Sequence, residues 1–281
     1  MLKQESASFY KRNGYYIEKS AHVKWLNDLS TILSDIDTVI LQQLHRLDTT
    51  LSLNVSTHKE TVHKHLNQLL NLDKTAYIAS LKLCANLFSV HSLFMSPGIV
   101  EMLRSFGIQL PVLQTTPVMH IMANNLKIPN GYYGIGVHQD WPSMQGSLDT
   151  VIVWIPLMGV DTNNFPLELI PGSHLGGLYS GKTSELLYET DPEHYNEKNF
   201  VPAELAFGDI LYMSSFLLHR STLTGGDGLR IACSNRYENA CEATYINRVY
   251  PHAQRRVVNR EFIHQNFPES AQVQKIFETT D

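Results

Sequence analysis

The stretch Gly136-Val137-His138-Gln139-Asp140-Trp141 lies just before a run of β-branched and aromatic residues, Asp149–Pro156. In an extended chain, residues two positions apart project to the same side, so His138 and Asp140 point together and Gln139 points the opposite way. An imidazole and a carboxylate that converge are two ligands that a divalent transition metal accepts. The tripeptide is a weak signal by itself, so the interpretation depends on further ligands.

A third residue of the right type, His219, stands much further along, in Phe216-Leu217-Leu218-His219-Arg220-Ser221. Two histidines and one carboxylate on one face of an octahedral ion, with three positions open, form the ligand set of non-haem Fe(II) oxygenases. If the turn Thr224–Gly228 reverses the chain, Arg230 returns along a neighbouring strand, on the same strand face as Arg236. A guanidinium there would suit the far carboxylate of a dicarboxylic cosubstrate, and a structural ion pair is the alternative.

The rest of the 281 residues predicts a helical first third and a β-rich remainder. With 43% apolar and 17% charged residues the chain builds a large core, which excludes a disordered or fibrous protein. Apolar periodicity and the N-cap pair Ser96-Pro97 predict helices from Val23 to Leu44 and over Val62–Leu72, Ala76–Val90 and Ile99–Phe106. After Gly107, β-branched and aromatic runs between turn signals predict strands over Pro117–Met122, Asp149–Pro156, Leu167–Ile170, Asp209–Phe216, Leu229–Tyr237 and Tyr245–Tyr250.

The net charge, the apolar pattern and the cysteines indicate which kinds of partner and which compartment to expect. The formal net charge is -5 and the chain has no basic stripe, so we expect a small-molecule partner and no nucleic acid. No window approaches the roughly 18 consecutive apolar residues of a membrane span, and the first residues lack a signal peptide. Cys84, Cys233 and Cys241 form no Cys-x-x-Cys pair. These features favour a cytoplasmic protein with no membrane partner and leave its oligomeric state open.

Taken in order, the motifs resemble those of the phytanoyl-CoA dioxygenase family of Fe(II)- and 2-oxoglutarate-dependent oxygenases, over nearly the whole chain. The segments that carry the resemblance are Phe9–Tyr16, Ser96-Pro97, Met119–Met122, His138–Asp140, Val153-Trp154, Ile170–His174, Phe207–Asp209, His219 and Arg230. Two departures stand out: Asn163–Pro166 replaces an Asn-Gly turn, and Arg220 stands where glycine usually follows the distal histidine. Arg220 lies either near the metal ligands or, by strand parity, on the face opposite His219, and parity favours the second placement, which leaves metal binding intact.

The resemblance implies a cofactor set and a role for each matching residue. It implies Fe(II) ligation by His138, Asp140 and His219, and 2-oxoglutarate binding by Arg230 and Ser221, with Met122 and Trp154 lining that pocket. It implies O2 as the other cosubstrate and hydroxylation of a small organic molecule with release of succinate and CO2. Lys82 is a further candidate cosubstrate contact, His174 is expected to be structural, and the role of His120 is open. The residues that flank the ligands, Gln139, Trp141, Tyr132 and Tyr133, are either substrate contacts or solvent-facing loop residues.

The implied fold is mainly β with flanking α: a double-stranded β-helix, of the jelly-roll and cupin-like type, with N-terminal helices packed on one sheet. We expect a single domain over residues 1–281, with a helical part at about 1–108, a β-helix core at about 109–259 and a tail at 260–281. Two other functions compete: a cupin-like metal-dependent sugar isomerase or epimerase, which has no need of Arg230, and a non-catalytic binding module on a decayed oxygenase barrel, which has no need of the intact ligand set.

Overall fold

The computed structural model describes residues 2–19, 23–127, 134–183, 188–222 and 225–250. Its α-helices are α1 (Leu2–Asn13), α2 (Val23–Leu47), α3 (Lys59–Leu72), α4 (Lys74–Cys84), α5 (Phe88–Phe94), α6 (Pro97–Ser105), α7 (Trp141–Met144) and α8 (Ala243–Asn247). Its strands are β1 (Tyr15–Glu18), β2 (Pro111–Leu113), β3 (Val118–Met122), β4 (Val151–Pro156), β5 (Leu167–Leu169), β6 (Gly181–Thr183), β7 (Tyr188–Thr190), β8 (Val201–Ala203), β9 (Ile210–Ser214), β10 (His219–Ser221) and β11 (Arg230–Asn239).

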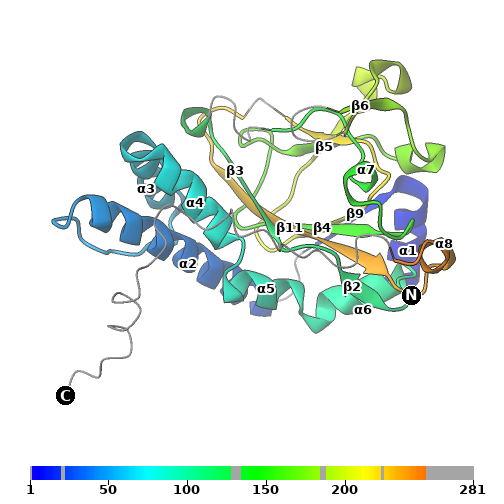
Figure 1. The fold of residues 1–281 in the computed structure, drawn as a ribbon, viewed down its shortest axis with the longest axis horizontal. Helices are drawn as coiled ribbons and strands as arrows, with labels where there is room; N and C mark the ends of the chain where they lie inside the picture. The colour runs from blue at the N-terminus through cyan, green and yellow to red at the C-terminus, as the bar shows by residue number, and fades with distance from the viewer. Residues whose placement is uncertain (1, 20–22, 128–133, 184–187, 223–224, 251–281) are drawn as a thin grey trace.

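Antiparallel sheets dominate the second part of the chain, as the sequence predicts. The main sheet has the order β1-β9-β4-β11-β2, with β3 also paired to β11, and a smaller sheet has the order β10-β5-β8. Helices α2 to α6 lie along one side of the main sheet, and β5 and β6 lie on its other side (Figure 1). The expected arrangement of antiparallel sheets with flanking N-terminal helices is therefore present.

Alternation along the strands separates the two faces of the main sheet. In β4, Val151, Val153 and Ile155 belong to the core that the helices share, whereas Ile152 and Trp154 face a second core with residues of the smaller sheet. Because successive side chains of a strand point to opposite faces of the sheet, one strand contributes residues to both cores. We call the face that carries Trp154 the inner face. Strand parity places Arg230 on the same face.

The helices follow the predicted pattern with one difference. The expected helix Ala76–Val90 is two helices, α4 and α5, separated at Ala85–Leu87. The Asn86 side-chain amide donates to the Lys82 carbonyl oxygen. This bond replaces the backbone bond that a continuing helix would make to that oxygen, so it favours the end of α4. Ser96 holds the N-cap position before Pro97, although its hydroxyl makes no capping bond.

Among the described residues no single helix is long and apolar enough to cross a membrane, and only the bent pair Lys74–Phe94 with Pro97–Ser105 meets that test by length and composition.

The predicted strand Tyr245–Tyr250 is wrong. The first half of this segment belongs to α8, whose N-cap is Glu242. The Glu242 carboxylate accepts hydrogen bonds from the backbone N–H groups of Thr244 and Tyr245 at 2.7 and 2.9 Å, which satisfies donors that a helix start leaves open. Aromatic and β-branched composition predicted a strand, but the local cap prevails. The predicted tail 260–281 and the last part of the predicted core lie outside the described residues.

Gly14 joins α1 to β1 at a point where the loop that follows β5 passes very close. Its φ is +76°, and a Cβ added there would lie 2.4 Å from His174 Nδ1 and 2.9 Å from Leu217 Cδ1. Both the backbone conformation and the lack of space therefore require glycine at this position.

We expect Gly14→Ala to lower the free energy of unfolding by more than Gly172→Ala. Gly172 has a similar φ of +79° but an added Cβ there would meet nothing closer than 3.6 Å, so it isolates the backbone cost. That cost is about 1–2 kcal/mol for an L residue, and the contact with His174 should add about 1–3 kcal/mol of overpacking at Gly14. Urea denaturation of the two variants measures the difference, and equal losses would show that the His174 ring moves away without cost.

Candidate metal centre

The three predicted metal ligands come together in the structure. His138, Asp140 and His219 are buried, and one ligand atom from each lies within 4.8 Å of the others. No other group of three or more His, Cys, Asp or Glu side chains converges in this way within the described ranges. A cluster of two imidazoles and one carboxylate therefore stands on the inner side of the fold.

Backbone pairing explains how two histidines far apart in sequence meet. The His138 N–H donates to the His219 carbonyl oxygen at 3.0 Å, and the His219 N–H donates back to the His138 carbonyl oxygen at 3.1 Å. Residues that exchange two such bonds are directly opposite in an antiparallel pair, so their side chains leave on the same side. The two ring centroids are accordingly 4.1 Å apart. Asp140 is in the N-cap position of α7, and its Oδ1 lies 3.6 Å from His138 Nε2.

Hydrogen bonds to backbone carbonyls set the tautomer of both rings. His138 Nδ1 lies 2.8 Å from the Gly136 carbonyl oxygen, and His219 Nδ1 lies 3.0 Å from that of Leu217. A carbonyl oxygen only accepts, so each Nδ1 carries the proton and each Nε2 presents its lone pair to the cluster. Partners of this kind orient metal-bound histidines in proteins.

The pKa values of His219 and Asp140 favour binding of a cation at this cluster. Burial and the neighbouring His138 lower the pKa of His219 to about 4, so this imidazole is neutral at pH 7. Burial opposes ionisation of Asp140, but the charge of the neighbouring Arg236 guanidinium favours the ionised form and holds the pKa of this carboxyl well below its ordinary value. Two imidazole nitrogens and one carboxylate fit Fe(II), which prefers this mixture of ligands with open positions beside it.

Two of the residues predicted to bind 2-oxoglutarate with Arg230, Met122 and Trp154, lie beside it. The Arg230 side chain is fully buried in β11 opposite Met122 of β3, donates to the Phe165 carbonyl oxygen, and has Nη2 2.7 Å from Met122 Sδ. Its Cζ lies 5.9 Å from the Trp154 ring centroid. Ser221 is buried and pairs with Leu167, which follows Phe165 by two residues, so one short segment borders both Arg230 and Ser221.

Two further inner-face residues were not among the predicted site residues. Arg236 reaches Asp140 with Nη2 3.6 Å from Oδ2, and its Nη1 donates to Ser234 Oγ at 2.9 Å. His120 lies 2.8 Å from the same hydroxyl through Nε2. Burial and the charges of Arg230 and Arg236 hold the pKa of His120 well below its ordinary value, so His120 is neutral. Strand parity had placed Arg236 on this face, but its contact with Asp140 depends on tertiary structure.

The other candidates lie away from the cluster. Lys82 is exposed on α4, and His174 Nε2 lies 3.0 Å from the Lys11 carbonyl oxygen, a structural contact. Arg220 points away from His219, as parity predicts, and bonds Glu168 and Glu197 at 2.7 Å each. Trp141 stacks on Phe216 with centroids 5.5 Å apart. Tyr132 and Tyr133 lie outside the described residues.

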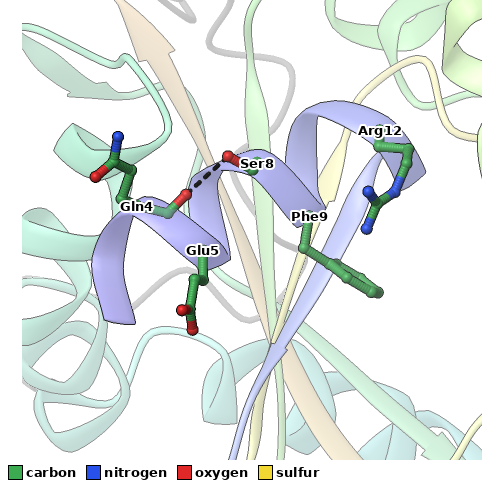
Figure 2. Close-up of a pocket in the computed structure, with 5 residues that line it drawn as sticks. All are labelled: Gln4, Glu5, Ser8, Phe9 and Arg12. Carbon is green, nitrogen blue, oxygen red and sulfur yellow. Dashed lines mark hydrogen bonds between the residues drawn. The ribbon is translucent and has the colours of Figure 1, made fainter. Parts of the chain in front are cut away.

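A surface hollow along α1 is not part of this centre. It has a volume of about 480 Å³ and is lined by Gln4, Glu5, Ser8, Phe9 and Arg12. All five come from one helix, and Ser8 donates to the Gln4 carbonyl oxygen within it (Figure 2). The Arg12 Cζ lies 5.9 Å from the Phe9 ring, so Ser8 and Arg12 both contact their own helix.

Gln139 is a buried structural residue, which excludes the solvent-facing alternative. Its side chain is 1% exposed and points away from the ligands, as predicted. Its Nε2 donates to the carbonyl oxygens of Gly177 and Phe216 at 2.7 and 2.6 Å, and its Oε1 accepts from the Tyr179 N–H at 3.0 Å. One amide therefore ties the loop of His138 and Asp140 to two others.

We expect Gln139→Leu to lower the free energy of unfolding by about 2–4 kcal/mol, because three backbone groups lose a partner in a buried position. Gln42→Leu, at an exposed position of α2, is the control and should change stability little. Urea denaturation measures both variants. A loss at Gln139 no larger than that at Gln42 would contradict the role of this amide.

Comparison with known proteins agrees with the geometry. The family model for phytanoyl-CoA dioxygenase (PhyH) matches residues 28–232. No curated protein matches the chain significantly. The non-heme monooxygenase ThoJ in its apo form has a TM-score of 0.55 at 14% identity, covering 83% of this chain and 76% of that one.

Two further solved structures share the fold at the same level of identity. The epimerase SnoN, in complex with Fe3+, alpha ketoglutarate and nogalamycin RO, has a TM-score of 0.54 at 14% identity, over 85% of this chain and 84% of that one. AviO1 from Streptomyces viridochromogenes Tue57 has a TM-score of 0.51 at 14% identity, over 85% and 96%. Because the family model spans most of the residues and the buried ligand cluster agrees with it, the chain belongs to the phytanoyl-CoA dioxygenase family.

Proposed function

We propose that the protein is an Fe(II)- and 2-oxoglutarate-dependent oxygenase that hydroxylates a small organic molecule and releases succinate and CO2. The observation that carries this proposal is the buried cluster of His138, Asp140 and His219 in the same fold as a fully buried arginine, Arg230. A 2-oxoglutarate site needs both elements, whereas a sugar isomerase needs only the first. The net charge of -5 supports a small-molecule partner over a nucleic acid.

Each residue has a role in this proposal. His138, Asp140 and His219 hold Fe(II), which, when bound, supplies O2 activation coupled to decarboxylation of 2-oxoglutarate. The Arg230 guanidinium and the Ser221 hydroxyl bind the distal carboxylate, since a buried planar cation suits a carboxylate that is removed from water. Trp154 and Met122 cover Arg230 and keep water from it. The fold that positions them is, in this proposal, a double-stranded β-helix of the jelly-roll type, within a single catalytic domain.

Epimerisation of a small molecule is the second candidate outcome. The solved neighbour that holds Fe3+ and alpha ketoglutarate is an epimerase. An enzyme of this kind would use the same ligands and Arg230 but return no oxygen atom to its substrate, so the second oxygen atom of O2 would leave as water with two electrons and two protons from an added reductant such as ascorbate. The two outcomes therefore differ in the product and in the fate of O2, while the protein residues are the same.

The test starts with purified protein under nitrogen. Fe(II) and 2-oxoglutarate are expected to produce a metal-to-ligand charge-transfer absorbance, and admission of ¹⁸O2 with a panel of candidate substrates should release succinate. A product that carries ¹⁸O supports hydroxylation, and an unlabelled stereoisomer supports epimerisation. A protein that binds Fe(II) but neither binds nor consumes 2-oxoglutarate would contradict the proposal and favour a sugar isomerase or a binding module.

A further inference from the structure

The two oxygens of the Asp140 carboxylate face different partners. Oδ1 lies 3.6 Å from His138 Nε2, on the side of the metal ligands, and Oδ2 lies 3.6 Å from Arg236 Nη2. The Asp140 and Arg236 side chains are only 12% and 15% exposed. The carboxylate is therefore placed between a metal-binding face and a cation, with one oxygen turned toward each.

A polar row from the sheet holds Arg236 in place. Its Nη1 donates to Ser234 Oγ at 2.9 Å, and that hydroxyl lies 2.8 Å from His120 Nε2 across the β3–β11 pair. A guanidinium is planar, so fixing Nη1 also fixes the direction of Nη2. Arg236 and Ser234 thus fix the orientation of Asp140 Oδ2 relative to the main sheet.

We propose that Arg236 is a positioning residue that engages Asp140 Oδ2 and leaves Oδ1 as the single ligating oxygen of this carboxylate. The inference rests on the proposed function, because it concerns the metal of that site. Three open positions beside two histidines and a carboxylate exist only if the carboxylate binds through one oxygen. With Fe(II) bound, two of these positions would suit the 2-oxo and carboxylate oxygens of 2-oxoglutarate, and the third would be needed by O2. Without Arg236, Oδ2 would be able to bind the metal at that third position.

A direct contact of Arg236 with 2-oxoglutarate is the competing role. Arg230 and Arg236 are six residues apart on β11, which places their Cα atoms roughly 20 Å apart along an extended strand. That separation is too large for both guanidinium groups to hold one carboxylate, and the two contacts of Arg236 are to Ser234 and Asp140. The experiment below separates the two roles.

Nitric oxide is the probe for the third position, because it binds Fe(II) as a stable substitute for O2 and gives an electron paramagnetic resonance signal. The Fe(II) protein with 2-oxoglutarate bound is titrated with nitric oxide under nitrogen. In Arg236→Met the dissociation constant of nitric oxide should rise about tenfold or more, while Fe(II) and 2-oxoglutarate binding change little. Arg236→Lys, which keeps a cation beside Oδ2, should restore much of the nitric oxide affinity, and Ser234→Ala should show a smaller loss.

Arg220→Met is the matched control, since Arg220 bonds Glu168 and Glu197 on the strand face opposite His219. Nitric oxide affinity at the wild-type level in both Arg236→Met and Ser234→Ala would overturn the proposal. Weaker 2-oxoglutarate binding with unchanged nitric oxide affinity would also overturn it, in favour of a cosubstrate contact. If Arg236→Met does not fold, as its thermal melt would show, Arg236→Lys and Ser234→Ala decide between these results. A wild-type protein that binds no Fe(II) or no 2-oxoglutarate would instead reject the proposed function.

Discussion

Asp140→Ala is expected to abolish 2-oxoglutarate turnover by the iron-loaded protein and to weaken Fe(II) binding by at least about tenfold. The substitution removes the only carboxylate of the cluster, so two imidazoles remain to hold a divalent cation. It also leaves the Arg236 guanidinium without the carboxylate that lies 3.6 Å away. Equilibrium dialysis against Fe(II) under nitrogen measures the affinity, and succinate release measures turnover.

Asp140→Asn separates the loss of the ligand from the loss of packing. It keeps the shape of the side chain and a neutral oxygen donor, so the fold should be preserved while Fe(II) binding and turnover are still strongly reduced. His219→Ala should behave like Asp140→Ala, and His174→Ala, which removes a contact with Lys11 and packing against Gly14 away from the cluster, should bind Fe(II) normally. Normal turnover in Asp140→Ala would show that the metal assignment is wrong. Normal turnover in His219→Ala would point to another histidine as the third ligand.

Arg230→Lys is expected to raise the dissociation constant of 2-oxoglutarate by ten- to hundredfold and to leave Fe(II) binding nearly unchanged. A lysine keeps the charge but replaces two parallel hydrogen bonds to a carboxylate by one at best. Charge-assisted hydrogen bonds contribute about 1.5–3 kcal/mol each, and about 1.4 kcal/mol corresponds to one factor of ten in a dissociation constant. Titration of the Fe(II) protein with 2-oxoglutarate under nitrogen, followed by charge-transfer absorbance, measures the change.

The location of Arg230 makes a stability control necessary. The side chain is fully buried and donates to the Phe165 carbonyl oxygen, so thermal melting should accompany the titration. Arg220→Lys is the matched variant, because Arg220 also makes two charge-assisted bonds but lies outside the cluster. It should leave the 2-oxoglutarate affinity at the wild-type level. An unchanged affinity in Arg230→Lys would move the anchor elsewhere, and joint loss of Fe(II) and 2-oxoglutarate would show that Arg230 is structural.

Local periodicity accounts for what the sequence predicts well. The orientation of His138 with Asp140, and of Arg220 away from His219, follows from the two-residue period of an extended chain, which needs no knowledge of partners. The 3.6-residue period likewise predicts α2, and the pair Ser96-Pro97 predicts the start of α6. The family resemblance adds the ligand set because its motifs retain their order along the chain.

Contacts between segments far apart in sequence required the tertiary structure. The reciprocal backbone bonds of His138 and His219 bring their rings together, and no local pattern encodes that pairing. The sequence leaves Gln139 as a possible solvent-facing loop residue. In the structure it is buried, because its amide bonds backbone groups of Gly177, Tyr179 and Phe216. Side-chain hydrogen bonds of this kind depend on positions in space.

The sequence by itself determined which residue types the site contains and which strand faces carry them, because side-chain direction is a local property of the backbone. Only the tertiary structure decided that Arg236 meets Asp140 Oδ2 and that the rings of His138 and His219 lie side by side. Arg236 needs the bulge-free pairing of β11 with β4 and the start of α7 at Asp140 to reach its partner. A guanidinium beside a carboxylate is a contact between two long side chains on separate elements, and its distance follows from packing.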